Sequence, residues 1–561
     1  MDRRAFVTTF AALGATGTAL ADLLLAQAQE QEQVTKEMLA CAEDVLGLEF
    51  TDAEREEMLD DLNDNLEDYA GIRDFELENA VAPAIQFDPV LPGTTLPTEQ
   101  RPIAWTRPAR VTRPASLEEV AFWPLTRLAE LVRTGQVTPS ELTRMYLDRL
   151  KRHGDRLEAV ITLTEERALV QAARLDSELA AGLYRGPLHG IPWGAKDLLA
   201  TVGYPTTWGA APYRDQVIDM DATVVRRLDE AGAILVAKLT LGALAQGDRW
   251  YGGRTRNPWN LEQGSSGSSA GSAATTVAGL VGFAIGTETL GSIVSPSTRT
   301  GASGLRPTYG RVPRTGAMAL SWSMDKIGPI CRSIEDCALV LDAIHGPDGQ
   351  DLTVREVPFL YDGTAALDGL RIGYYASAFE DDEREDRDWL ANDRAALDQV
   401  RRLAGRELIP VELPTRFPLG ALRGTILIAE AAAAFDDLTL SGRDDLMERS
   451  SWPNSFRQAR TIPAVEYINA NRIRTLVMEA TRQALSDVDV FITPSYGGVS
   501  LLLTNLTGHP EAVVPNGFRA DGTPTSIAFI SRLYREGEAI RLAKAYQEST
   551  GWHERTPPLF S

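Results

Sequence analysis

The chain has 561 residues, of which 44% are hydrophobic and 24% are charged, as is typical of a globular protein with a large core. This length fits one large α/β domain with additions, or two or three ordinary domains. Asp and Glu (78) outnumber Lys and Arg (56), which gives a formal net charge of −22. Such a surface repels the phosphates of nucleic acids and of anionic membranes, so neither is an expected partner.

Residues 1–28 have the order of a bacterial export signal. Arg3 and Arg4 precede a mildly apolar run rich in Ala and Gly, and small-x-small sequences follow at 19–21 and 26–28. This order predicts a signal peptide, and the paired arginines favour the twin-arginine route. The alternative is an ordinary amphipathic N-terminal helix. The run is too short to span a membrane, so we expect a periplasmic or secreted protein without stable membrane insertion.

Residues 29–115 are predicted to form an extension before the main domain. Residues 29–80 are acidic and repeat apolar side chains at helical spacing, with Thr51 as the N-cap of a second helix. Residues 83–115 are rich in proline, which indicates an extended arm on the surface or a linker. We expect residues 116–561 to fold and keep some activity without this accessory layer.

Residues 116–561 show no further break in composition. Helical patterns alternate with short apolar runs, such as those at 233–238 and 489–495. This alternation predicts an α/β protein whose sheet is covered by helices.

The three cysteines, Cys41, Cys331 and Cys337, provide neither a disulfide framework nor a zinc-binding spacing. Cys331 and Cys337 flank the start of a predicted helix with a capping box formed by Ser333 and Asp336. We expect both to be buried thiols rather than a disulfide.

Lys196 lies between apolar and small residues in HGIPWGAKDLLATVG (189–203). One interpretation is a structural lysine whose ammonium group reaches the surface. The other is a desolvated lysine, which loses its proton more readily and can act as a neutral base.

A run rich in Gly, Ser and Ala, QGSSGSSAGSAATTVAGL, occupies residues 263–280. Its composition is that of a flexible linker, but a linker here would divide the core of the α/β region. The remaining interpretations are a tightly packed corner between a helix and a strand, or a catalytic loop.

A third segment, GTETLGSIVSP (286–296), places Ser292 in a turn of small residues. Consecutive amides of such a turn can point at one spot and stabilise an oxyanion, so Ser292 is a candidate nucleophile. A Ser-His-Asp triad is the alternative, with the histidine of GHP (508–510) as its base.

Together these segments resemble the amidase signature family. The family has a Lys in GIPxxxKD, a GGSSGGSAA run and a GTDxGGSIRxPA turn, and this chain has GIPWGAKD, SGSSAGSAA and GTETLGSIVSP in the same order. Four further segments are similar to later family motifs: GASGLRPTYGRVPRTG, SMDKIGPICRS, DVFITPS and NLTGHPEAVVPNGF. The resemblance extends over about residues 116–561 and implies a large mixed β-sheet core covered by helices on both faces.

The resemblance also implies a Ser-cisSer-Lys catalytic set. By position, Lys196 is the base, Ser268 the middle serine and Ser292 the nucleophile that forms the acyl-enzyme. Ser292 follows Ser268 by 24 residues, which is the usual spacing in the family. The peptide bond between Gly267 and Ser268 is expected to be cis.

The same resemblance implies roles for the surrounding residues. The amides of Thr289, Leu290, Gly291 and Ser292 are expected to form the oxyanion hole, and Ser269 to add hydrogen bonds near the centre. No metal and no cofactor are implied, and the substrate is expected to be a small-molecule amide.

Three positions depart from the family pattern. Leu290 replaces a glycine and must therefore avoid a positive φ. Glu288 stands where the family has Asp, and Val294 stands where it has Arg. We expect Arg299 or Arg306 to pair with Glu288 instead.

The leading interpretation is therefore an exported amidase. The alternatives are an ester or carbamate hydrolase of the same family and a protein like the A subunit of the glutamyl-tRNA amidotransferase, which an export signal contradicts. A catalytically inactive binding protein is disfavoured because Lys196, Ser268 and Ser292 are all present. The sequence makes no prediction about oligomeric state.

Export is testable through the paired arginines. Replacing Arg3 and Arg4 together by Lys should retain the protein in the cytoplasm, because the pair is the feature that indicates the twin-arginine route. Immunoblots of cytoplasmic and periplasmic fractions would measure the change. Unchanged secretion of the double variant would reject this route.

Overall fold

The structure, a computed structural model, describes residues 34–73, 77–381, 386–447, 449–496 and 498–561. The predicted signal peptide lies outside these residues. The chain divides into two compact units, Met1–Glu78 and Asn79–Ser561.

The described part of the first unit contains α3 (Lys36–Leu46) and α4 (Asp52–Arg73). Thr51 caps α4 as predicted, because its Oγ1 accepts the amide of Glu54 at 3.3 Å while the Glu54 carboxylate accepts the amide of Thr51 at 2.6 Å. Glu43 of α3 and Arg55 of α4 form an ion pair at 2.9 Å that joins the two helices.

The second unit is built on a mixed sheet of eleven strands in the order β1-β3-β2-β8-β10-β9-β14-β15-β13-β11-β12. Parallel pairing joins β2 to both β3 and β8, and β11 to both β12 and β13. The sheet strands are β1 (Val160–Leu163), β2 (Pro192–Lys196), β3 (Ile234–Leu239), β8 (Phe283–Glu288), β9 (Ser303–Arg306), β10 (Lys326–Cys331), β11 (Ile372–Tyr375), β12 (Ile409–Val411), β13 (Val490–Pro494), β14 (Glu511–Phe518) and β15 (Pro524–Ser531). Two short hairpins pair β4 (Arg249–Trp250) with β5 (Gly253–Arg254), and β6 (Arg256–Asn257) with β7 (Asn260–Gly264).

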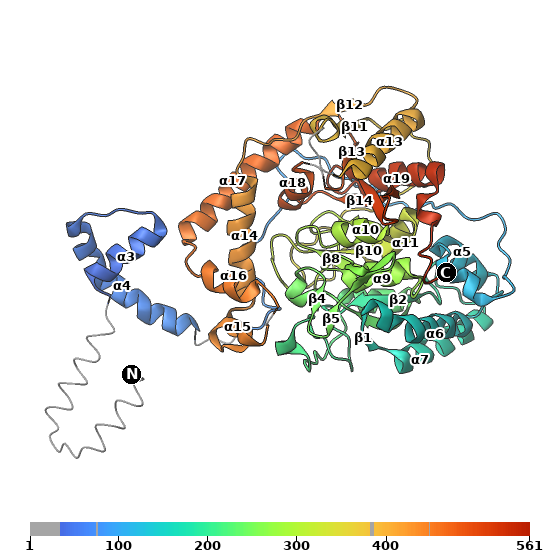
Figure 1. Ribbon diagram of the computed structural model, residues 1–561, viewed down its shortest axis with the longest axis horizontal. Helices are drawn as coiled ribbons and strands as arrows, with labels where there is room; N and C mark the ends of the chain where they lie inside the picture. The colour runs from blue at the N-terminus through green and yellow to red at the C-terminus, as the bar shows by residue number, and fades with distance from the viewer. Residues whose placement is uncertain (1–33, 74–76, 382–385, 448, 497) are drawn as a thin grey trace, which may run out of the picture. The chain divides into compact units, whose positions relative to one another are not determined.

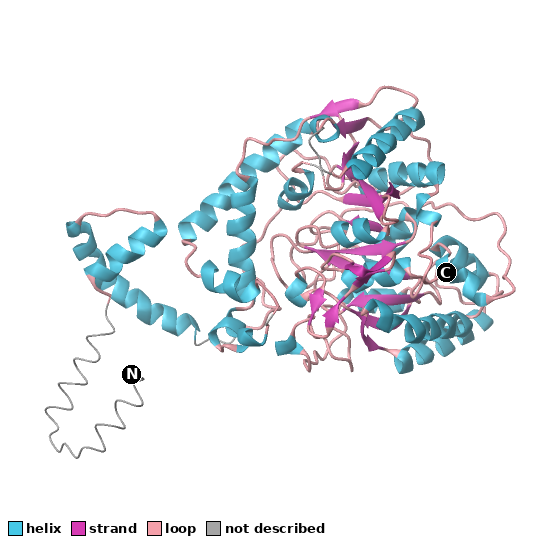
Figure 2. Ribbon diagram, in the orientation of Figure 1, coloured by secondary structure: helices cyan, strands magenta, loops and turns pink. Residues whose placement is uncertain are grey.

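Helices surround this sheet, as Figure 1 and Figure 2 show. They are α5 (Leu125–Arg133), α6 (Pro139–Leu157), α7 (Glu165–Ala180), α8 (Thr223–Glu230), α9 (Ala270–Val277), α10 (Val294–Thr300), α11 (Ile334–Ile344), α12 (Ala376–Phe379), α13 (Arg387–Ala404), α14 (Leu419–Ala434), α15 (Asp436–Leu440), α16 (Trp452–Ala459), α17 (Ala464–Ala484), α18 (Ser500–Thr507) and α19 (Glu536–Thr550).

Both faces of the sheet are buried, which confirms the predicted architecture. Successive strand residues point to opposite faces, and they enter different clusters of the core. Ile234 and Val236 of β3 pack in one cluster with residues of α6, α7 and α9, whereas Leu235 packs in another that includes residues of α11. The runs predicted at 233–238 and 489–495 are β3 and β13.

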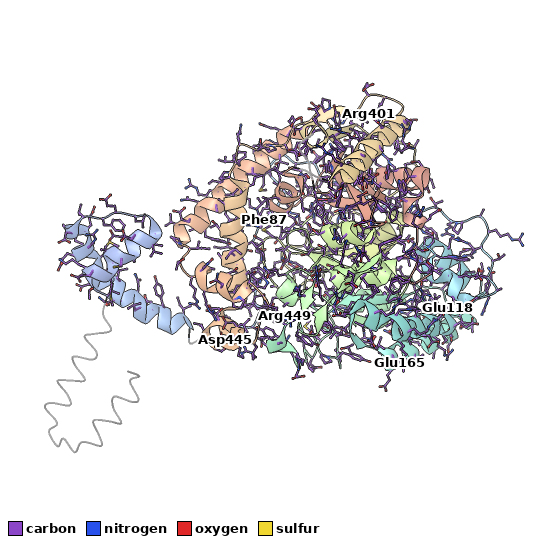
Figure 3. The ribbon with its side chains drawn as sticks, viewed as in Figure 1. Phe87, Glu118, Glu165, Arg401, Asp445 and Arg449 are labelled. Carbon is purple, nitrogen blue, oxygen red and sulfur yellow. The ribbon has the colours of Figure 1, made fainter. Side chains whose placement is uncertain are left out.

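The proline-rich arm forms part of the second unit. It contains no α-helix or β-strand within residues 83–115, and a single bridge joins Ala104 to Asp362. Phe87, labelled in Figure 3, packs against Tyr309 with 5.0 Å between ring centroids. The arm is therefore extended, as expected, and lies on the unit that carries the predicted site.

Cys331 and Cys337 are buried free thiols, as predicted. Cys331 ends β10 and Cys337 lies in the first turn of α11, which starts after Ser333, but the Ser333 side chain makes no capping hydrogen bond. The capping-box prediction was therefore wrong in this respect: the Asp336 carboxylate accepts the amide of Thr126 at 3.4 Å, because α5 packs close to the start of α11. Within the described residues, no helix combines the length and apolarity needed to cross a membrane.

Candidate active site

The predicted site forms where two parallel strands end side by side. Lys196 is the last residue of β2, and β8 runs beside β2 with Ala195 opposite Ile285. Because parallel strands end at the same edge of a sheet, the side chain of Lys196 meets Thr287 near the end of β8. The Gly/Ser run leads into α9, which packs on these strands and brings Ser268 and Ser269 to the same place.

Lys196 lies at the centre of a buried cluster of hydroxyl groups. Its Nζ is 2.8 Å from Ser268 Oγ, 2.8 Å from Thr287 Oγ1 and 3.1 Å from Ser269 Oγ. The side chain of Lys196 is fully buried. Of the two interpretations of Lys196 from sequence, the buried lysine is confirmed.

Burial lowers the pKa of the Lys196 amine to about 7, although the carboxylates of Asp325 and Glu288 act to raise it. Burial dominates because an ammonium group loses its hydration when water is excluded. Near neutral pH, a large share of Lys196 is therefore uncharged and can accept a proton.

The peptide bond between Gly267 and Ser268 is cis, as the family resemblance implied. The backbone of Gly247 passes close to this bond. A Cβ placed on Gly267 would lie 1.8 Å from the carbonyl oxygen of Gly247, so only glycine fits at this position.

Ser269 links the Gly/Ser run to the end of β8 and to the loop that follows it. Its Oγ accepts the amide of Thr287 and donates to the Thr287 carbonyl, both at 3.1 Å. Its own amide donates to the carbonyl of Ser292 at 3.1 Å. Ser269 thus provides the local hydrogen bonds expected of it.

Residues 289–292 form a tight loop between β8 and α10. Gly291 adopts a φ of 79°, whereas Leu290 is absent from the residues with positive φ, as its substitution for glycine requires. In the part of the chain that the structure describes, no acceptor takes a hydrogen bond from the amides of residues 289–292. These amides are therefore free to bind an oxyanion, whereas no hydrogen bond joins the Ser268 and Ser292 hydroxyls among the described side chains.

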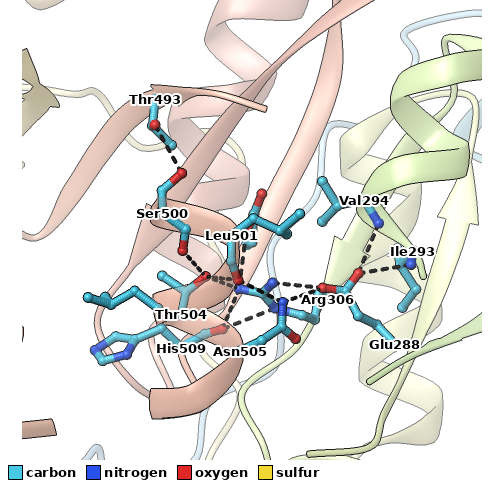
Figure 4. Close-up of polar contacts among 12 residues, drawn as sticks. Glu288, Ile293, Val294, Arg306, Thr493, Ser500, Leu501, Thr504, Asn505 and His509 are labelled. Atoms are coloured by element: carbon cyan, nitrogen blue, oxygen red, sulfur yellow. Dashed lines mark hydrogen bonds and ion pairs between the residues drawn. The ribbon is translucent and has the colours of Figure 1, made fainter. Parts of the chain in front are cut away.

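Glu288 fixes the start of α10 from inside the protein (Figure 4). Its Oε2 accepts the amides of Ile293 and Val294 at 2.8 and 3.0 Å. Its Oε1 accepts from Arg306 and from Asn505 of α18, each at 2.8 Å. The carboxylate therefore determines the backbone path directly after Ser292.

Of the two partners predicted for Glu288, Arg306 forms the ion pair, at 2.8 Å, whereas Arg299 donates to Gln263 at 2.7 Å. Burial by itself would raise the pKa of Glu288, but the positive charges of Arg306 and Lys326 outweigh it and lower the pKa to about 2. Glu288 is thus a carboxylate throughout the physiological range.

Thr287 and Asn505 are site residues that the sequence reasoning missed. Thr287 lies inside the quoted GTETL motif, so its place beside a candidate nucleophile was a usable signal. Asn505 comes from α18, far along the chain, and no sequence pattern connects it with Glu288.

The structure does not support the alternative of a Ser-His-Asp triad with His509 as the base. The ring Nδ1 of His509 lies 2.8 Å from Thr507 Oγ1, and burial, with a smaller effect of Arg306, lowers the pKa of His509 to about 3. All five histidines lie among the described residues, and none of them forms a hydrogen bond with Ser268 or Ser292 there.

A cavity of about 510 Å³ opens next to this cluster, with Thr287 and Thr289 in its lining. This volume is in the range of small-molecule sites. Within the described residues, no group of three or more His, Cys, Asp or Glu side chains is arranged to hold a metal ion.

Comparison with known proteins agrees with this geometry. A profile of the Amidase family matches residues 141–502. The A subunit of the glutamyl-tRNA(Gln) amidotransferase from Roseiflexus sp. (strain RS-1) is 35% identical over 483 residues, which cover 77% of this chain and 97% of that protein. The chain therefore belongs to the amidase signature family.

Solved structures agree with the fold. The native peptide amidase from Stenotrophomonas maltophilia is 32% identical, with a TM-score of 0.71 over 79% of this chain and 100% of that chain. A bacterial aryl acylamidase of the amidase signature family has a TM-score of 0.70 over 77% of this chain and 97% of that chain, and its 23% identity shows a common fold alone.

The ion pair between Glu288 and Arg306 should be important for stability. Arg306→Gln leaves a buried carboxylate without its closest positive charge, which typically costs about 3–5 kcal/mol. We expect a lower urea midpoint of unfolding and reduced turnover, because the loop after Ser292 depends on Glu288. The matched control is Arg299→Gln, which should change both little. Equal midpoints for the two variants would contradict this account of the loop.

Proposed function

We propose that this protein hydrolyses the carbon–nitrogen bond of a carboxamide through an acyl-enzyme on Ser292. The observation that carries the proposal is the buried amine of Lys196, with a pKa of about 7, placed 2.8 Å from Ser268 Oγ. Membership of the amidase signature family supports the same chemistry.

In the first half-reaction, neutral Lys196 accepts the proton of Ser268, and Ser268 accepts the proton of Ser292. The Oγ of Ser292 then attacks the amide carbon and forms a tetrahedral intermediate. The free amides of residues 289–292 stabilise the negative oxygen of this intermediate.

To complete acylation, the proton returns from Lys196 through Ser268 to the leaving nitrogen as the carbon–nitrogen bond breaks. The products of this step are an amine or ammonia and an ester on Ser292. Water, activated by the same relay, then hydrolyses the ester and releases the carboxylic acid.

An amide is the proposed substrate because the peptide amidase from Stenotrophomonas maltophilia is 32% identical and its match covers 79% of this chain. An ester or carbamate would require the same nucleophile and oxyanion hole. Turnover rates of an amide and an ester with the same acyl group, and of a carbamate of the same amine, would separate the three.

The similarity to amidotransferase subunits favours a second candidate, a component of an amidotransferase that acts on glutamyl-tRNA. The net charge of −22 opposes contact with a nucleic acid. Purification of the tagged protein from its own cells tests this candidate. Stoichiometric partner subunits in the eluate would favour the amidotransferase over an enzyme that acts alone.

We also propose that the protein is exported, with its action in the periplasm or outside the cell. This proposal rests on Arg3, Arg4 and the two small-x-small sequences.

Replacing each of the three residues of the proton relay should lower kcat by a different amount. Ser292→Ala removes the nucleophile and should lower kcat by about 10⁴-fold or more, with Lys196→Ala nearly as severe. Ser268→Ala interrupts proton transfer but keeps the nucleophile, so a residual rate should survive. The double variant with Lys196→Ala and Ser292→Ala should lower kcat no further than Ser292→Ala alone, since the residues act as a unit.

Ser272→Ala is the matched control for these variants, because Ser272 lies in the same run and its Oγ donates to the Ile285 carbonyl at 3.0 Å. It should retain turnover. A fluorophosphonate should label Ser292 and no other serine, as mass spectrometry of the peptides would show. Labelling of another serine, or full activity of Ser292→Ala, would overturn the assignment.

The pH profile should report the protonation of Lys196. The base works only when neutral, and burial lowers its pKa to about 7. We therefore expect kcat/KM to rise by about tenfold per pH unit below pH 7 and to level off above it. Steady-state rates between pH 5 and pH 9 measure this. Maximal activity below pH 6 would show that Lys196 is not the base.

A further inference from the structure

Residues 79–87, here called the strap, border the cavity beside the proposed catalytic centre. Residues 79, 80 and 82–86 line the same cavity as Thr287 and Thr289. Thr287 Oγ1 lies 2.8 Å from the Lys196 amine, so the cavity that the strap borders lies beside the proposed catalytic centre. The strap precedes the part of the chain that matches the Amidase family, residues 141–502.

Side chains attach the strap at both ends. At one end, the Asn79 amide group pairs with the backbone of Ala319: Nδ2 donates to its carbonyl at 2.8 Å, and Oδ1 accepts its N–H at 2.7 Å. At the other end, the Arg474 guanidinium lies 3.5 Å from the ring centroid of Phe87. Both attachment points belong to the same compact unit as the cavity.

Between these ends, the strap makes no backbone hydrogen bond with the rest of the described chain. Residues 80–86 are all exposed, and those that line the cavity include Ala80, Ala82, Pro83 and Ala84. Small side chains therefore form the middle of this wall, with the larger Ile85 and Gln86 beside them. The size of the residues at 80–84 limits how much of the cavity a substrate can fill.

The charged groups on the facing walls already contact polar groups of the protein. Arg314 forms an ion pair with Asp351 at 3.0 Å, and Lys326 Nζ donates to the side-chain amide oxygen of Asn505 at 2.7 Å.

Asp325, the other acidic group of the lining, accepts the Thr289 hydroxyl at 2.5 Å and the amide of Leu320 at 2.8 Å. The remaining lining includes the apolar side chains of Leu198, Met220, Met318 and Ile327. The walls thus offer apolar surface. Arg314 and Asp351 form an ion pair there, and Lys326 and Asp325 are hydrogen-bonded to neutral groups of the protein.

We propose that the strap is a specificity wall that selects uncharged amides with a bulky apolar substituent. The inference rests on the proposed amide hydrolysis and adds the substrate class to it. A charged substituent would lose its hydration in this cavity without gaining a partner, which is unfavourable. An apolar substituent would bury surface against the strap and the facing wall, which is favourable.

The test uses the full chain and two neighbouring substitutions in the strap. Ala84→Trp adds bulk at a residue that lines the cavity, whereas Val81→Trp adds it at an exposed residue outside the lining. The probes are 4-phenylbutyramide, its 4-carboxyphenyl analogue and propionamide. Ala82→Trp is a second variant of the lining.

We expect Ala84→Trp to lower kcat/KM for 4-phenylbutyramide about tenfold and to leave that for propionamide within about twofold. Val81→Trp should leave both values unchanged. The 4-carboxyphenyl analogue should be the poorer substrate of the unmodified enzyme. Three results would overturn the proposal. They are an equal decrease in kcat/KM for 4-phenylbutyramide and propionamide in Ala84→Trp, a decrease in Val81→Trp as large as that in Ala84→Trp, and a higher kcat/KM for the 4-carboxyphenyl analogue than for 4-phenylbutyramide.

Binding separates failure of the strap from failure of the proposed reaction. Calorimetry with the Ser292→Ala protein measures the Kd of 4-phenylbutyramide without turnover. Combining Ala84→Trp with Ser292→Ala should raise this Kd about tenfold, and combining Val81→Trp with Ser292→Ala should not change it. If the enzyme hydrolyses no amide but these Kd values follow the expected pattern, the reaction is wrong and the strap stands. If the Kd of 4-phenylbutyramide is the same with and without Ala84→Trp, the proposal that the strap selects the substrate is rejected.

Discussion

Removal of water from the amine of Lys196 is the constraint on which the proposed site depends. An exposed lysine is protonated at neutral pH and cannot act as a base. Here two buried parallel strands, β2 and β8, enclose the side chain, and three hydroxyl groups replace its water. The hydroxyls satisfy the amine by hydrogen bonding without adding charge, so burial can still lower its pKa.

The loop after β8 depends on a buried group that stays charged, whereas Lys196 must be able to lose its charge. Glu288 is as buried as Lys196, yet it must be ionised to bind the amides of Ile293 and Val294 strongly. Arg306 supplies the charge that the family places at position 294, where this chain has Val294. The guanidinium comes from β9 rather than from the loop itself, so the loop keeps its support although its own sequence has changed.

The extension before the family match contributes to the site as well as to the fold. Its segment at residues 79–87 borders the cavity and is attached by Asn79 and Phe87. Such a wall can change its sequence without disturbing the buried catalytic cluster, because it shares no strand or helix with that cluster. Specificity and chemistry are thereby carried by separate parts of one compact unit.

The sequence by itself determined the α/β class, the helices around Thr51, the position of β3 and β13, and the candidates Lys196, Ser268 and Ser292. The elements follow from apolar periodicity and turn composition, whereas Ser268 follows from the resemblance of the ordered motifs to the amidase signature family. The sequence also narrowed the partner of Glu288 to Arg299 or Arg306, but local pattern could not choose between them. The tertiary structure chose Arg306, because β9 carries its side chain toward the start of α10 while Arg299 turns to Gln263. Asn505, the Asp336 contact with Thr126 and the strap over the cavity were likewise decided only in three dimensions, since each joins segments distant in sequence whose proximity depends on how the sheet and its helices pack.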